Sequence, residues 1–188
     1  MKFFKTVIAL SVLAASTSAL SLDNNRKGFQ IGIGAGAGKL VSQRSDEGVL
    51  EQPNYVDQFG VNTTFRLGGG ISEHFSLFYI NNVGWSADEY GINTAAVGGM
   101  AAQLFLTDSA PSLYVIGGGG LGSFSRSTAY TSASYAGLGF MAGVGYEIID
   151  HVQIEAMWNQ TGNNINLENY DLTMNSSSFG ITLNYVWY

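Results

Sequence analysis

The amino-acid sequence predicts an all-β protein, and within that class an eight-stranded antiparallel up-and-down transmembrane β-barrel. First, several segments alternate apolar and small polar residues with a period of two, the pattern of a strand with two unlike faces. Second, charged residues make up only 12% of the chain, against roughly 25% in an ordinary soluble domain. Third, tight turns and longer polar segments alternate between these strands, as they do in membrane barrels.

The last predicted strand, at residues 179–188, shows this alternation. One of its faces carries only apolar and aromatic side chains, namely Phe179, Ile181, Leu183, Tyr185 and Trp187. The other face carries Gly180, Thr182 and Asn184. We expect the first face to contact lipid and the second face to line a packed polar interior.

Seven further segments show related alternation. We expect strands at residues 28–38, 57–68, 74–85, 92–106, 113–124, 138–148 and 152–159. The registers of 92–106 and 113–124 stay open, because small apolar residues occupy both of their faces. The polar segments 41–55, 86–91, 125–134 and 160–171 are predicted loops, and 69–73, 107–112 and 149–151 are predicted tight turns.

The distribution of charge favours a membrane barrel over a soluble one. The polar strand faces consist almost entirely of Gly, Asn, Gln, Ser and Thr. Water would tolerate charge on those faces, whereas a confined interior disfavours it, because a buried charge needs a partner. Aromatic residues lie near the strand ends on the apolar faces, as in interfacial girdles: Phe29, Phe75, Trp85, Trp158, Tyr185 and Trp187.

Three charged residues, Arg66, Glu147 and Glu155, lie within predicted strands on the inward face. We expect them at similar depth near the end of the barrel that carries the tight turns. An eight-stranded interior is just wide enough for side chains to fill it, so we interpret them as a structural ion-pair cluster. A selectivity ring in a narrow pore is the alternative.

Glycine is abundant on the inward faces, at positions 32, 34, 36, 38, 139, 143 and 145. We interpret these glycines as relieving crowding inside a narrow, curved sheet. None of them opens a helix after a strand, so a nucleotide-binding loop is not expected. The chain has no cysteine and two histidines, His74 and His151, and we expect neither a metal site nor a cofactor.

The N-terminus has the three-part organisation of a secretory signal peptide. A basic head at residues 1–5 is followed by an apolar run at 6–15 and by small residues up to Ala19. We expect cleavage after Ala19, which leaves residues 20–188 as the barrel domain. Removal of Lys2 and Lys5 leaves 8 − 2 = 6 basic residues against 14 acidic ones, a formal charge of −8. An acidic exported protein is a poor candidate for nucleic-acid binding.

These features resemble the small eight-stranded outer-membrane barrels, the OmpA/OmpX-like and opacity-type porin-family proteins. The resemblance rests on the exported N-terminus, on 28–38 and 138–147, and on the aromatic C-terminal strand, and it covers the whole mature chain. It implies a location in a Gram-negative outer membrane, in contact with lipid and lipopolysaccharide. It also implies that the barrel-assembly machinery reads Trp187 and Tyr188 as an assembly signal, although the apolar register here ends on Trp187.

Function is less sharply specified than fold. The leading hypothesis is a structural or adhesion-type surface role without catalysis, in which the Ser/Thr/Tyr-rich segment 125–135 contacts an extracellular ligand. A narrow pore for ions or small solutes is the alternative. A third is a lipid-modifying enzyme, because His74 and Ser76 resemble the His-x-Ser pair of lipid A deacylases; we do not expect this activity, because the pair lies at a turn.

Acidic residues outnumber basic ones in the predicted outer loops. They are Asp46, Glu47, Glu51, Asp88, Glu89, Glu168 and Asp171, against Arg44 and Arg126. We interpret this surface as solvated, with divalent-cation binding as the alternative.

Overall fold

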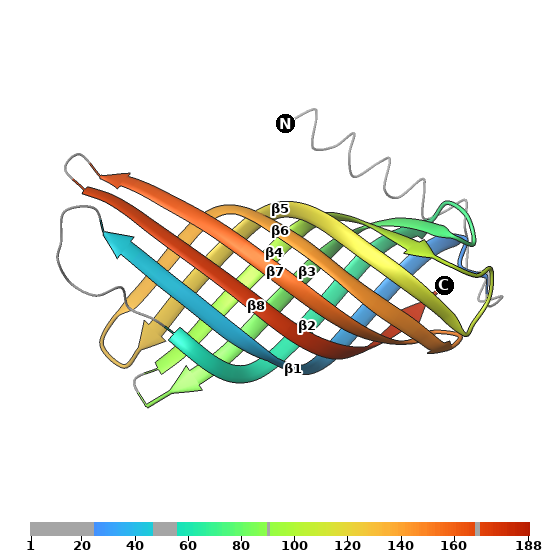
Figure 1. Cartoon of the computed structure of the whole chain (residues 1–188), viewed down its shortest axis with the longest axis horizontal. Helices are drawn as coiled ribbons and strands as arrows, with labels where there is room; N and C mark the ends of the chain where they lie inside the picture. The colour runs from blue at the N-terminus through green and yellow to red at the C-terminus, as the bar shows by residue number, and fades with distance from the viewer. Residues whose placement is uncertain (1–24, 47–55, 90, 168–169) are drawn as a thin grey trace.

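The computed structural model describes residues 25–46, 56–89, 91–167 and 170–188. The chain forms one closed barrel in which each strand pairs with its neighbour in sequence and β8 pairs with β1 (Figure 1). All eight pairings are antiparallel, which confirms the predicted up-and-down topology. The strands are β1 (Gly28–Asp46), β2 (Val56–Gly70), β3 (Phe75–Asp88), β4 (Gly91–Phe105), β5 (Ser112–Thr128), β6 (Ser132–Ile149), β7 (Val152–Leu167) and β8 (Tyr170–Trp187).

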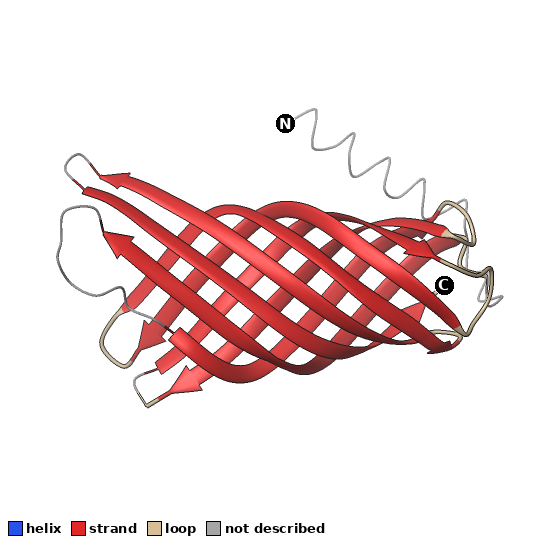
Figure 2. Cartoon of the chain, in the orientation of Figure 1, coloured by secondary structure: helices blue, strands red, loops and turns tan. Residues whose placement is uncertain are grey.

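The barrel wall consists of strands throughout the described residues (Figure 2). In that part of the chain, no helix has the length and apolar character needed to cross a membrane. The expected signal peptide, residues 1–19, lies outside the described residues. We call the end of the barrel with connections 71–74, 106–111 and 150–151 the turn end, and the opposite end the hairpin end. The C-terminus lies at the turn end (Figure 1).

The strands are longer than the sequence pattern predicts. The segment 125–134 was expected to be a loop, yet β5 continues to Thr128 and β6 begins at Ser132. The predicted loop 160–171 is likewise mostly strand, because β7 continues to Leu167 and β8 begins at Tyr170. Backbone pairing needs no apolar side chains, so Ser-, Thr- and Asn-rich sequence extends the sheet past the point where apolar alternation stops.

The expected asymmetry between short turns and long loops is therefore largely wrong. Three residues, 129–131, separate β5 from β6 at the hairpin end. At the turn end, the longer stretch 106–111 separates β4 from β5. What distinguishes the hairpin end is the extension of paired strands. Strands of 14–19 residues exceed the roughly 9–11 that cross a bilayer when tilted.

The outer surface carries an apolar band with defined borders. Four residues on neighbouring strands form a row at its hairpin-end border. In order from β2 through β1 and β8 to β7, they are Phe59, Lys39, Phe179 and Trp158. The Lys39 ammonium lies 2.7 Å from Asp57, so charge begins where the band ends. Near the turn end, the band carries exposed Phe29, Tyr185 and Trp187. Aromatic residues thus mark both borders, as in membrane barrels.

The interior is not uniformly polar, which corrects the expected polar lining. A buried apolar layer spans five strands and contains Phe78, Ile80, Val97, Ala101, Phe105, Tyr114, Ile116, Met141 and Met157. It fixes the registers of β4 and β5, because Val97 and Tyr114 point inward. Phe78 and Ile80 also point into this layer, so the inward face of β3 carries apolar residues and its alternation is interrupted. Bulky side chains are accommodated because glycines lie beside them on the neighbouring strand.

Two interior glycines show this accommodation directly. At Gly32, an added Cβ atom would lie 2.6 Å from the Cγ atom of Arg66. At Gly145, an added Cβ atom would overlap the ring of Tyr114. The absence of a side chain at these positions therefore makes room for two of the largest buried side chains.

We predict that Gly145→Ala destabilises the barrel by about 1–3 kcal/mol, because the Tyr114 ring has to shift within a packed interior. Gly117→Ala is the matched control, since the nearest atom to its added Cβ lies 3.8 Å away. That control should stay within about 0.5 kcal/mol of the parent. Urea unfolding from lipid vesicles, followed by tryptophan fluorescence, measures both. Equal midpoints for the two variants would contradict this account.

Candidate functional site

The lumen near the turn end contains a buried ion pair between β2 and β7. The Nη2 atom of Arg66 lies 3.0 Å and 3.1 Å from the two carboxylate oxygens of Glu155. The Tyr114 hydroxyl donates to the same carboxylate at 3.0 Å. The Arg66 guanidinium also lies 5.3 Å from the ring centroid of Phe78. Both charged groups are fully buried, so each depends on the other for compensation.

A second buried ion pair joins Arg26, just before β1, to Glu147 of β6. The Nε atom of Arg26 donates to Glu147 at 2.8 Å, and its Nη2 atom contacts the same oxygen. The guanidinium also donates to the backbone carbonyl of Thr107 and lies 3.9 Å from the Phe105 ring centroid. Arg26 is only 2% exposed, although it belongs to the polar segment before the first predicted strand.

Gln153 connects the two ion pairs. Its side-chain oxygen lies 3.4 Å from Nη1 of Arg66, and its Nε2 atom donates to Glu147 at 3.3 Å. Arg66, Glu147 and Glu155, singled out in the sequence, therefore lie in one hydrogen-bonded network. Glu147 takes its counter-charge from Arg26, however, and not from Arg66.

A signal for Arg26 was present in the sequence. Gln30 and the even-numbered glycines define the inward face of β1, and Arg26 has the same parity. The side chain of Gln30 donates to the Arg26 carbonyl, which continues the inward row past the start of the strand.

The C-terminal residue also enters this network. Tyr188 is 4% exposed, and its hydroxyl donates to Glu147 at 2.8 Å. The backbone N–H of His151 donates to the Tyr188 hydroxyl at 3.1 Å, and the His151 ring lies against the Tyr188 ring with centroids 4.5 Å apart. Burial raises the pKa of the Tyr188 hydroxyl above its ordinary value, so the group stays protonated as a donor.

The inward turn of Tyr188 explains why the apolar register ends one residue earlier. In β8, alternate residues remain exposed on the outer surface: Phe179, Ile181, Leu183, Tyr185 and Trp187. The next position in the alternation points into the lumen. His151, which lies in the predicted tight turn 149–151, is partly buried and has a positive φ of 73°.

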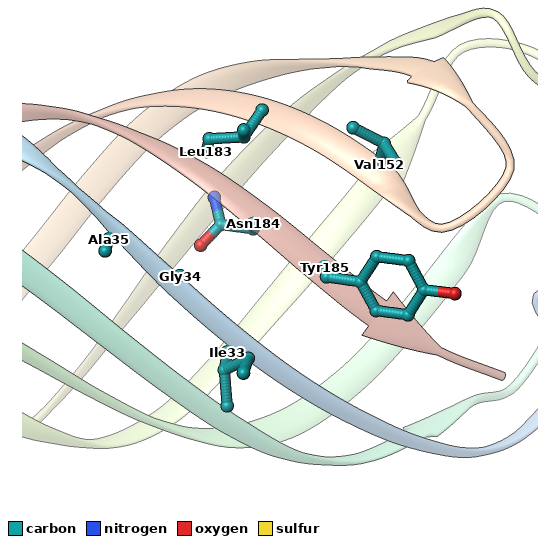
Figure 3. A pocket seen from close by; sticks show the side chains of 7 residues that line it. All are labelled: Ile33, Gly34, Ala35, Val152, Leu183, Asn184 and Tyr185. Carbon is teal, nitrogen blue, oxygen red and sulfur yellow. The ribbon is translucent and has the colours of Figure 1, made fainter.

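An open cavity of about 360 Å³ lies on the outer surface, where β1, β8 and the start of β7 meet. Figure 3 shows Ile33, Leu183 and Tyr185 around it, with Gly34 and Ala35 providing the space. Its lining is almost entirely apolar and continuous with the exposed apolar band. We interpret it as a space that lipid acyl chains occupy.

A polar belt crosses the lumen between the turn end and the hairpin end. Thr64 donates to Asn82 at 2.8 Å, Asn82 donates to Asn159 at 3.3 Å, and Asn159 donates to Ser178 at 3.2 Å. These residues belong to β2, β3, β7 and β8. Beyond the belt lies a second apolar cluster of Leu40, Ala95, Phe124 and Met174. Side chains thus fill the lumen in successive layers.

The residues that suggested a deacylase do not form a catalytic pair. The His74 ring lies 2.9 Å from Asp108, on a neighbouring connection at the turn end. Ser76 is completely buried, and its hydroxyl has no hydrogen-bond partner within the described residues. A serine that is not hydrogen-bonded to its base lacks the arrangement that activates a nucleophile.

Of the acidic residues near the hairpin end, Asp88 is engaged in a local network. Its carboxylate accepts from Arg126 at 3.2 Å and from Gln58 at 3.2 Å. Glu47, Glu51 and Glu168 lie outside the described residues, and only the backbone is described for Arg44, Asp46 and Asp171. In the described part of the chain, no group of three His, Cys, Asp or Glu residues is arranged to hold a metal ion.

We predict that Arg66→Met destabilises the barrel by about 3–5 kcal/mol, because it leaves the Glu155 carboxylate buried without a counter-charge. Adding Glu155→Met should recover most of this loss, since the double variant buries no unpaired charge. Thermal unfolding by heat-modifiable gel mobility, supported by urea titration, measures both. An unchanged midpoint in Arg66→Met, or a double variant as unstable as the single one, would refute the pairing.

Comparison with known proteins places this architecture in a family. The outer membrane protein beta-barrel domain family matches residues 6–186. Among the curated proteins, none matches the chain.

Several solved structures are similar to this chain. The Neisserial surface protein A structure has 14% identity and a TM-score of 0.51, and the match covers 84% of this chain and 96% of that one. OprG from Pseudomonas aeruginosa has 13% identity and a TM-score of 0.51, with 88% and 99% covered. The attachment invasion locus protein of Yersinia pestis, determined with the heparin analogue sucrose octasulfate, has 15% identity and a TM-score of 0.44, with 82% and 98% covered.

At these identities the likeness concerns the fold alone. The family match spans nearly the whole chain and agrees with the closed eight-stranded sheet and its exposed apolar band. This chain therefore belongs to the outer membrane protein beta-barrel domain family.

Proposed function

We propose that this protein is a surface-interaction barrel of adhesion type, without a catalytic role and with an interior closed by its own side chains. Membership of the family supports a location in the bacterial outer membrane. The observation that carries the proposal is the contrast between the two parts of the barrel. Its lumen is packed in layers, while its wall continues past the apolar band as polar, fully paired strands.

The strand extensions at the hairpin end support a role in contact with other surfaces. Beyond Leu121 and before Leu138, β5 and β6 stay paired up to Ser127 and Ser132. Paired strands hold side chains in fixed positions, which lowers the entropy cost of binding compared with a mobile loop. At the tip, Tyr130 is 96% exposed. Tyrosine is enriched among the residues that contribute most of the binding energy at protein interfaces.

The proposal includes the route to the membrane. Residues 1–19 act as an export signal that is removed after Ala19. The barrel-assembly machinery then reads Trp187 and Tyr188 at the end of β8. In the finished barrel, the outer face of β8 contacts outer-membrane lipid, and the hairpin end lies among lipopolysaccharide on the extracellular side.

We predict that Tyr130→Ser lowers the adhesion of bacteria displaying the barrel severalfold, because it removes a large exposed side chain from the tip. The binding surfaces are immobilised extracellular-matrix glycoproteins and cultured host cells. Ile71→Ser is the matched control, since Ile71 is 66% exposed at the opposite, turn end. Loss of adhesion in the control, or none in Tyr130→Ser, would count against contact through this tip.

We also predict that the purified barrel produces no stable unitary conductance in planar bilayers, because buried side chains occupy each level of the lumen. A porin reconstituted in the same bilayers is the positive control. Reproducible conductance steps that scale with protein concentration would favour the alternative of a narrow pore.

A further inference from the structure

A cavity of about 140 Å³ opens inside the barrel at the hairpin end. Its floor and walls come from several strands, with Ser42 on β1, Val56 on β2 and Met174 on β8. Ser42 pairs opposite Val56 and Ser176, three positions beyond Lys39 at the border of the apolar band. The cavity therefore lies in the part of the barrel that extends out of the membrane.

The walls of this cavity suit a small apolar body. Phe124 and Tyr135 stack with ring centroids 6.5 Å apart and planes inclined by 29°. Phe124, Val56 and Met174 are each buried and contribute no polar side-chain donor or acceptor except the weak thioether. A cavity of roughly 150 Å³ with apolar walls accepts one benzene ring, so a single aromatic ring matches the space available here.

Ser42 provides a polar group that lacks a partner. Its side chain is fully buried, and its hydroxyl makes no hydrogen bond within the described residues. Buried hydroxyl groups are normally hydrogen-bonded, because a donor taken out of water without compensation is costly. Since Ser42 lines the cavity, a ligand oxygen placed there would accept its hydrogen bond.

Arg126 provides a fixed positive charge at the same cavity. Its Nη2 atom donates to Asp88 at 3.2 Å, and Asp88 is itself held by Gln58 at 3.2 Å and by Asn93 at 3.4 Å. This network orients the guanidinium without occupying all of the five N–H donors that the group carries. A planar guanidinium held in this way matches a carboxylate, which accepts two parallel hydrogen bonds from it.

We propose that this cavity is a binding site for a small aromatic carboxylate. The ring of the ligand lies in the apolar space beside Phe124 and Tyr135, and its carboxylate accepts from Arg126 and from the Ser42 hydroxyl. Neither contact needs the tip residue Tyr130, so the site is independent of the adhesion role. It adds recognition of a small molecule to the outer mouth of a barrel whose lumen is otherwise packed.

Benzoate is the probe that tests this site. Isothermal titration of the barrel in lipid nanodiscs should show one saturable site, and benzyl alcohol should bind about tenfold or more weakly, because it lacks the charge. Saturable binding of benzoate with this preference supports the site. No saturable binding, or equal binding of the two compounds, overturns it.

Variants separate the site from partition into lipid. Ala133 lines the cavity and pairs directly opposite Arg126, so Ala133→Trp should abolish benzoate binding. Ala136→Trp, on the opposite face of the same strand, should leave it unchanged. Binding that survives Ala133→Trp overturns the proposed location.

Two further variants test the polar contacts. Arg126→Gln should weaken benzoate binding about tenfold and leave benzyl alcohol unaffected, and Ser42→Ala should weaken benzoate binding severalfold. Heat-modifiable gel mobility first confirms that each variant is folded, and Ala133→Trp decides the question if Arg126→Gln does not fold. Benzoate binding unchanged in both folded variants overturns the assigned contacts. The adhesion assay is independent of all these outcomes.

Discussion

The structure depends on one constraint: a closed sheet of eight strands leaves an interior that side chains have to fill. Closure satisfies the backbone and removes the sheet edges that lipid would not tolerate. It also makes the lumen too narrow for water to solvate every polar group that faces it. Large inward side chains such as Arg66 and Tyr114 consequently lie opposite glycines, and polar inward side chains lie opposite one another.

Charge follows from the same constraint. Two ion pairs, Arg66 with Glu155 and Arg26 with Glu147, compensate buried charges that solvent does not reach. A buried pair of this kind contributes little net stability over an apolar pair, but it strongly disfavours arrangements that separate the partners. The pairs therefore specify which strands face each other across the lumen, while the apolar layer around Phe78 and Tyr114 forms the larger of the two buried apolar clusters. The hairpin end follows a different rule, because its wall continues past the border of the apolar band.

Alternation in the sequence was sufficient to predict the architecture. The outer face of β8, from Phe179 to Trp187, repeats without interruption, and the number and order of strands followed from such patterns. Strand ends could not be predicted in the same way. At 125–134 and 160–171, the residues that continue the sheet have the composition of loops. What makes them strands is backbone pairing with the adjacent strand of the same hairpin, which side-chain alternation does not reveal.

In the lumen, alternation predicted which residues point inward, but their partners depend on contacts between residues far apart in the sequence. Parity identified Arg66, Glu147 and Glu155 as inward, and they do lie in one network. The partner of Glu147 could not be chosen from spacing, because Arg26 precedes the first strand, 121 residues away. Phe78 and Ile80 interrupt the alternation of β3 for a related reason. An apolar residue satisfies both the lipid face and an apolar layer in the lumen, so its direction depends on the volume left by the opposite wall.

The position of Glu147 has a consequence for how the barrel reaches its final state. Its carboxylate binds Arg26 on one side and Tyr188 on the other, residues that flank the first and last strands and lie 121 and 41 positions away. The Tyr188 contact needs only the consecutive pairing of β6, β7 and β8, whereas the Arg26 contact forms only when β8 meets β1. An open sheet therefore carries this carboxylate without its counter-charge, and intermediates in which β1 and β8 are not yet paired gain little from it. Closure of the barrel is therefore cooperative, because this contact stabilises the closed barrel and not a sheet in which β1 and β8 are still apart.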